Sequence, residues 1–184
     1  MEVIVMRHRS RLRFFILFGL PLLIWMAVIY HFSSEPYTKQ NLRPWLKQEF
    51  SDKRINQLFS ESRIQYNGKE VSIRKNGTWG FVEFFIRKAA HLFVYVVLAI
   101  LMARLVHRGL GRSKLTVYVA VISASALFAG LDEFHQSFVA QRTAAIEDVI
   151  LDTCGALLGT AMYYFFLKIL QKSRKNAPNH PKTS

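Results

Sequence analysis

The apolar positions of this chain gather into four long blocks separated by polar segments, and this pattern predicts four transmembrane helices. The blocks lie near residues 14–32, 81–105, 115–139 and 146–170. Each is close to the roughly 20 residues that an α-helix needs to cross a hydrocarbon core of about 30 Å. We therefore expect an all-α fold, an integral membrane bundle of four transmembrane helices.

The first block, FFILFGLPLLIWMAVIYHF, follows a basic stretch and is compatible with a signal peptide as well as with a retained helix. Its apolar run is long and no small-x-small cleavage site follows it, which favours the retained helix. Arg7, Arg9, Arg11 and Arg13 lie directly before it, and such charges keep a helix end in the cytoplasm. We expect a multi-pass cell-membrane protein with both termini cytoplasmic.

The polar segment 33–80 then forms a 48-residue extracytoplasmic loop between the first two helices. Apolar residues recur in it at helical spacing and predict one or two amphipathic helices on the membrane surface. These residues are Leu42, Trp45, Leu46 and Phe50, followed by Ile55, Leu58 and Phe59. Alternating side chains around Asn67-Gly68 predict a small β-hairpin near 63–74. The simplest role for this loop is to cover the outer ends of the helices.

Composition and charge agree with a membrane location. Of the 184 residues, 51% are hydrophobic and the mean hydropathy is +0.15, unlike a typical soluble domain. The net charge is +13, but Lys and Arg flank the apolar blocks, so the expected partner is anionic lipid and not nucleic acid. The single cysteine, Cys154, rules out a disulfide framework. Residues 173–184 are polar and basic, and we expect a disordered tail.

Ionisable residues interrupt three of the apolar blocks. Because a charge that faces lipid costs at least about 2.5–3.5 kcal/mol, these groups are expected to face the bundle interior and pair with one another. In the predicted topology they all come to the outer ends of their helices. Asp132, His135 and Gln136 share one helix face by spacing, and Gly155 and Gly159 form a GxxxG pair that predicts close helix packing.

These residues suit two kinds of role around one outward-facing polar pocket. Histidines beside carboxylates suit proton transfer, so the catalytic candidates are His91, Asp132, Glu133, His135 and Asp152. Cations and hydrogen-bonding groups suit a phosphate, so the substrate-binding candidates are Arg87, Lys88, Tyr95, Gln136, Arg142 and Asp148. The structural alternatives are that Arg87 and Lys88 anchor a helix at the interface and that Tyr95 is a core aromatic.

A metal held by Asp132, His135 and a carboxylate of the fourth helix is a further alternative. The Asp-x-x-His spacing occurs once, without the second His-bearing motif that di-metal bundles use. No metal site is therefore predicted, and the sequence leaves the question of a cofactor open.

The segments RKAAHLFVYVVLA and LDEFHQSFVAQRTAAIEDVILDTCGALLG carry the spacing D-E-x-H-Q, R, D, D, G-x-x-x-G. This resembles the signature of the VanZ-like family of bacterial membrane proteins, and the Ser-Ser of HFSSEP resembles it too. The resemblance covers roughly residues 14–170, so 1–172 is identified as a VanZ-like transmembrane domain. The catalytic and binding candidates all fall on the family's motif positions. Val94 stands where many relatives carry Glu.

That family is named for an accessory protein that lowers susceptibility to the glycopeptide antibiotic teicoplanin. The resemblance implies a cell-envelope protein whose partners are membrane lipids, and beyond them a lipid-linked envelope precursor or a glycopeptide antibiotic. It implies no reaction. An enzyme acting on a phosphorylated lipid-linked substrate and a non-enzymatic binding or scaffold module both remain open, as does the oligomeric state. A proton-coupled transporter is disfavoured, because four helices are few and no inverted repeat is visible.

Overall fold

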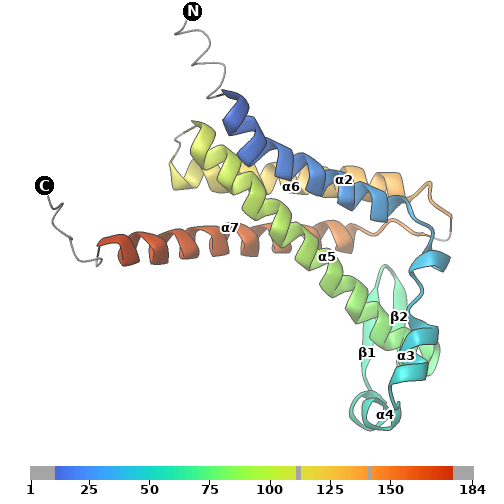
Figure 1. The fold of residues 1–184 in the computed structure, drawn as a ribbon. Helices are drawn as coiled ribbons and strands as arrows, with labels where there is room; N and C mark the ends of the chain where they lie inside the picture. The colour runs from blue at the N-terminus through green and yellow to red at the C-terminus, as the bar shows by residue number, and fades with distance from the viewer. Residues whose placement is uncertain (1–10, 111–112, 141, 176–184) are drawn as a thin grey trace, which may run out of the picture.

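The computed structural model describes residues 11–110, 113–140 and 142–175. Four helices in this part are long and apolar enough to cross a membrane: Arg11–Ser34, Ile73–Gly109, Lys114–Gln136 and Ile146–Ser173. They pack against one another as a bundle (Figure 1). The predicted all-α architecture with four spans is confirmed.

The first span combines a π-helical turn, η1 (Phe15–Gly19), with α2 (Leu20–Ser34). The other three are α5 (Ile73–Leu110), α6 (Lys114–Gln136) and α7 (Ile146–Lys175). Between α2 and α5 the chain forms η2 (Tyr37–Gln40), α3 (Arg43–Glu49), α4 (Lys53–Phe59), β1 (Arg63–Tyr66) and β2 (Lys69–Ser72). Helices α3 and α4 appear where helical spacing predicted them; their contact with a membrane surface stays a prediction.

The hairpin prediction is confirmed in position and in turn chemistry. Strands β1 and β2 are antiparallel, with Tyr66 opposite Lys69. Between them, Asn67 and Gly68 have φ angles of 49° and 66°. Both values are left-handed, as a type I′ turn requires, and Asn-Gly tolerates them best.

Several helix ends differ from the predicted ones. Helical backbone begins at Ile73, so the segment after α2 ends at 72 and is shorter than the predicted loop 33–80; Gly77, with φ at 70°, interrupts this first turn. Helix α6 ends at Gln136 and not at 139, because the following amides bond in tight turns. Helix α7 continues to Lys175, so 173–175 are helical and not tail. The rest of that tail, 176–184, lies outside the described residues, as do Arg7 and Arg9.

Small residues bring α7 directly against α5. A Cβ atom added to Gly155 would lie 2.6 Å from the carbonyl oxygen of Leu92, and one added to Gly159 would collide with the Val96 carbonyl. Ala99 and Ala156 are fully buried in the core beside this contact. The GxxxG pair therefore acts as a packing element, in agreement with the prediction.

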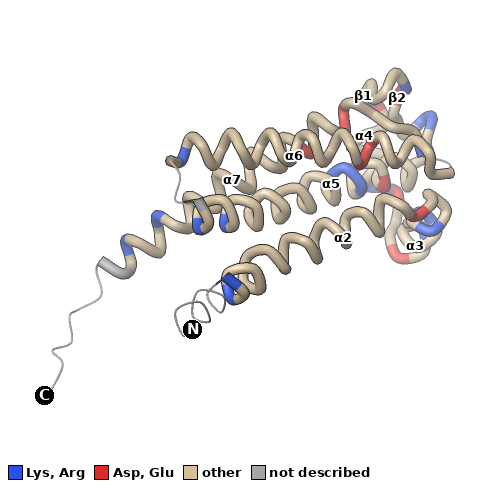
Figure 2. Tube along the Cα trace, turned by 90° about the horizontal axis from the view of Figure 1, so that it is seen from above, with Lys and Arg blue, Asp and Glu red and all other residues tan. Residues whose placement is uncertain are grey.

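The two ends of the bundle differ in charge. We call the end that carries the β-hairpin the hairpin end, and the end where α5 finishes and α6 begins the basic end. All described Asp and Glu residues fall within 35–83 and 132–152, at the hairpin end (Figure 2). The charged residues that the structure describes at the basic end are all Lys or Arg, among them Arg11, Arg108 and Lys114.

Candidate functional site

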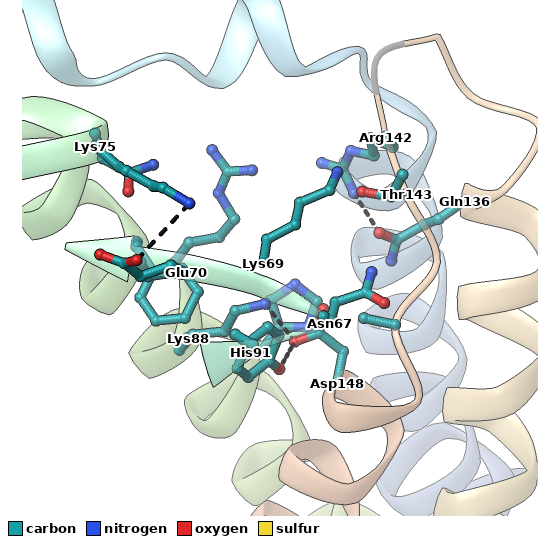
Figure 3. A pocket seen from close by; sticks show the side chains of 17 residues that line it. Asn67, Lys69, Glu70, Lys75, Lys88, His91, Gln136, Arg142, Thr143 and Asp148 are labelled. Carbon is teal, nitrogen blue, oxygen red and sulfur yellow. Dashed lines mark hydrogen bonds and ion pairs between the residues drawn. The ribbon is translucent and has the colours of Figure 1, made fainter. Parts of the chain in front are cut away.

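A polar cleft of about 630 Å³ opens at the hairpin end. Its walls come from the β-hairpin, the first half of α5, the loop before α7 and the first turn of α7 (Figure 3). Its charged lining residues are Lys69, Lys75, Arg87, Lys88, Arg142, Glu70 and Asp148. Three of the five cations pair with carboxylates: Lys75 with Glu70, Arg87 with Glu83 and Lys88 with Asp148. Lys69 and Arg142 form no ion pair among the described residues, so these two charges favour an anionic ligand in the cleft.

In one corner of the cleft, side chains of the hairpin and α5 both contact Asp148 of α7. The Lys88 ammonium lies 2.5 Å from Oδ1 of Asp148, and the Tyr66 hydroxyl donates to the same oxygen at 2.6 Å. Lys88 also lies 4.3 Å from the centre of the Tyr66 ring. Burial, together with the bond to Asp148, raises the pKa of the Tyr66 hydroxyl, so Tyr66 remains a donor.

His91 and Asp152 form a pair between α5 and α7, just inside this corner. The His91 Nδ1 atom lies 3.4 Å from Oδ1 and 3.5 Å from Oδ2 of Asp152, whose side chain is fully buried. Asp152 therefore orients the ring and leaves Nε2 available for another partner.

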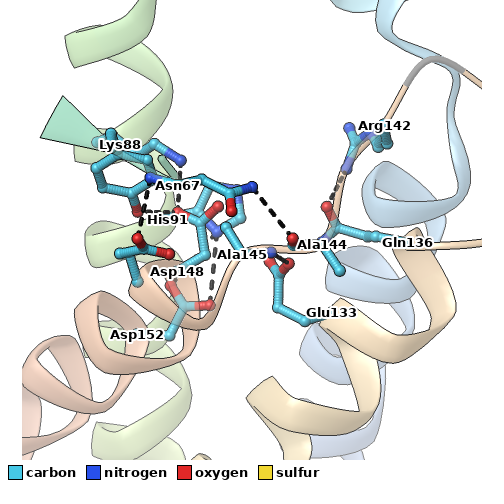
Figure 4. A network of polar contacts seen from close by, with 12 residues as sticks. Asn67, Lys88, His91, Glu133, Gln136, Arg142, Ala144, Ala145, Asp148 and Asp152 are labelled. Atoms are coloured by element: carbon cyan, nitrogen blue, oxygen red, sulfur yellow. Dashed lines mark hydrogen bonds and ion pairs between the residues drawn. The ribbon is translucent and has the colours of Figure 1, made fainter. Parts of the chain in front are cut away.

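A second chain of polar contacts runs along the other side of the site (Figure 4). The Gln136 amide donates to Oδ2 of Asp132 at 2.8 Å and accepts from Nη1 of Arg142 at 2.9 Å. Arg142 Nη2 donates to the side-chain oxygen of Gln40 at 2.5 Å. Among the described residues Arg142 has no carboxylate within ion-pair distance. Burial lowers the pKa of its guanidinium, and the charge of Arg87 acts in the same direction.

The structure does not place His135 and Glu133 in the pocket. His135 Nε2 lies 3.1 Å from the Ser34 hydroxyl of α2, and its ring packs on Tyr30. The predicted grouping of His135 with Asp132 and Gln136 does not bring His135 into either cleft, because it lies about 100° from Gln136 around the helix and packs against α2. The Glu133 side chain instead accepts from the Ala145 backbone amide at 2.9 Å, which fastens the loop before α7.

The alternative metal site is not assembled either. Among the described residues, no three His, Cys, Asp or Glu side chains gather as metal ligands. Asp132 faces Gln136, whereas His135 faces α2, so the two do not converge.

A second cleft of about 330 Å³ lies between α2, α5 and α6. Most of its exposed wall surface is apolar, although polar side chains also line it. Its apolar lining residues include Val28, Ile29, Phe32, Ala90 and Val94. We call it the apolar cleft. It shares four lining residues with the polar cleft: Arg87, His91, Gln136 and Arg142. Tyr95, predicted to bind substrate, lines the apolar cleft and also belongs to the core, where it is 1% exposed.

Comparison with models of protein families matches residues 18–167 to the family described as VanZ/LLP1. The chain belongs to the VanZ/LLP1 family. The matched range includes both clefts and every candidate residue predicted from the sequence. No curated protein and no solved structure matches the chain.

Within the VanZ/LLP1 range, residues that the sequence did not single out also build the site. Glu83 is 2% exposed and accepts from Arg43 Nε at 2.6 Å and from the Tyr37 hydroxyl at 2.9 Å. It lies in an apolar block of the sequence. Because a charge in the membrane needs an interior partner, this position could have been recognised as part of the site. Gln40 and Tyr66 carry no such signal, because they lie in a polar segment whose folding onto the helices is not a local property.

Proposed function

We propose that the polar cleft binds a cell-envelope component with a phosphate or pyrophosphate headgroup, and that this binding underlies any effect of the protein on teicoplanin susceptibility. The proposal is carried by the two lining cations that form no ion pair among the described residues, Lys69 and Arg142. Arg142 lacks a carboxylate partner in the described chain, and its Nη atoms donate to the uncharged acceptors of Gln136, Gln40 and Phe32. An anion in the cleft would compensate the buried guanidinium.

The proposal places the hairpin end on the extracytoplasmic side. Support comes from Arg11 and Arg13, which lie at the start of the first span, at the basic end, because the first helix usually dominates orientation. Clusters of Lys and Arg near helix ends are retained in the cytoplasm. The cleft then opens toward the outer leaflet, where envelope precursors are used.

For chemistry on the bound headgroup, the proposed proton-transfer residue is His91, with Asp152 as its orienting partner. Asp152 holds Nδ1, so Nε2 can donate a proton to, or accept one from, a ligand oxygen. His91 lines both clefts, so it lies at their junction, beside any ligand that extends from one cleft into the other. His135, which contacts α2, has no part in this proposal.

Binding of inorganic pyrophosphate to full-length protein in nanodiscs tests the charge argument by calorimetry. Arg142→Gln should weaken binding at least tenfold. Because Arg142 also holds Gln40 and Gln136, Lys69→Gln is the cleaner variant: Lys69 makes no ion pair among the described residues, and its loss should cost about threefold. Lys47→Gln removes the same charge from α3, outside the cleft, and should bind like wild type. Equal affinity of all three variants would overturn the proposal.

A non-enzymatic scaffold is a second candidate, and a specific observation favours it. Several polar residues of the site fasten chain segments to one another: Glu133 holds the Ala145 amide, and Glu147 accepts from the Asn67 amide at 2.9 Å. The two candidates differ in their response to nearly isosteric changes. In a deletion strain at equal membrane abundance, a scaffold keeps its effect on teicoplanin susceptibility with His91→Gln, whereas a proton-transfer site loses it.

A further inference from the structure

We propose that the ligand is an amphiphile with one hydrocarbon chain, which lies in the apolar cleft while the phosphate-bearing headgroup lies in the polar cleft. This inference rests on the proposed function, because it takes the anion site of the polar cleft as its starting point. It adds the lipid class and the path of the chain.

The first observation is that the two clefts meet. Arg87, His91, Gln136 and Arg142 line both of them, so one continuous ligand can pass from one to the other. The exposed wall surface of the polar cleft is mostly polar, and that of the apolar cleft is mostly apolar. A molecule that fills both must therefore change from anionic to apolar along its length, and the change falls beside His91 and Arg142.

The second observation is the size of the apolar cleft. Its volume of about 330 Å³ is at the small end of ligand pockets, which range over roughly 300–1,000 Å³. A volume at this end of the range suits one chain segment. Phe32 is 60% exposed and Ala90 is also exposed, so the cleft reaches the outer surface of the bundle, where a chain can enter from the lipid.

Ligand competition in nanodiscs tests the inference. Full-length protein is titrated with dodecyl phosphate, with the two-chain lipid dioctanoyl phosphatidic acid and with inorganic pyrophosphate, and empty nanodiscs correct for partitioning. Dodecyl phosphate should displace pyrophosphate and bind at least tenfold more tightly than dioctanoyl phosphatidic acid. Equal binding of the one-chain and two-chain lipids would overturn the inference.

Matched alanine variants on α5 locate the chain. Ala90 lines the apolar cleft, so Ala90→Leu should weaken dodecyl phosphate binding about tenfold and leave pyrophosphate binding unchanged. Its neighbour Ala89 is equally exposed but lines neither cleft, and Ala89→Leu should behave like wild type. If Ala90→Leu binds both pyrophosphate and dodecyl phosphate like wild type, the inference about the chain is overturned, while the proposed function stands. Absence of pyrophosphate binding to wild type would overturn the proposed function and, with it, this inference.

Discussion

Replacing Gly155 with alanine tests whether the contact between α5 and α7 sets the geometry of the His91–Asp152 pair. The added Cβ would lie 2.6 Å from the Leu92 carbonyl oxygen and 3.2 Å from Cβ of Tyr95, whereas ordinary contact begins at 3.4 Å. Both neighbours are backbone or the root of a side chain, so they cannot rotate away. The two helices must therefore separate by about 0.8 Å, the difference between 3.4 Å and 2.6 Å.

Two consequences follow, one for stability and one for the site. Overpacking of this kind costs about 1–3 kcal/mol, which corresponds to a fall in melting temperature of about 2–12 °C for a chain of this length. The same separation would lengthen the 3.4 Å contact between His91 and Asp152 beyond hydrogen-bonding distance. We expect Gly155→Ala to melt at a lower temperature in detergent. If His91 has the proposed proton-transfer role, the variant should also lose its effect on teicoplanin susceptibility, with a smaller change in pyrophosphate affinity.

Gly130 supplies the control, because it is also a helical glycine and an added Cβ there has nothing within 4 Å. Gly130→Ala should melt at or slightly above the wild-type temperature, measured by tryptophan fluorescence in the same detergent. If Gly155→Ala melts with Gly130→Ala and binds normally, α7 does not contact α5 as closely as described, and the proposed link between packing and the site is refuted.

Three further predictions concern the hairpin end and its orientation. Glu83→Gln should lower the free energy of unfolding by about 1–3 kcal/mol, because it weakens the hydrogen bonds that hold α3 to α5. Protease cleavage within 35–60 should then be faster, and an unchanged cleavage rate would contradict this role. Tyr66→Phe removes a hydrogen bond to a charged carboxylate and should lower the stability of the hairpin by about 1.5–3 kcal/mol. Hydrogen exchange in β1 and β2 should then be faster, and wild-type protection there would contradict this prediction. In a Cys154→Ser background, a membrane-impermeant maleimide should label Lys69→Cys in intact cells and leave Arg108→Cys unlabelled; the reverse pattern would invert the proposed topology.

Length and local chemistry were enough to predict the four spans and the hairpin. A run of apolar residues long enough to cross the bilayer is favoured in lipid wherever its neighbours lie, and Asn67-Gly68 adopts the required turn from its own backbone preferences. The cost of an intramembrane charge also predicted interior partners for His91 and Asp152, and the structure pairs these two residues with each other. The same principle applied to Glu83 would have added it to the set.

The partner of each polar side chain depends on which helix lies beside it, and sequence periodicity does not contain that information. His135 and Gln136 are adjacent in the chain, yet one faces Ser34 of α2 and the other faces Arg142. The clefts arise in the same way, because they are spaces left between the four spans, the loop before α7 and the folded segment after α2. The junction of the two clefts at His91 therefore became visible only in the folded chain.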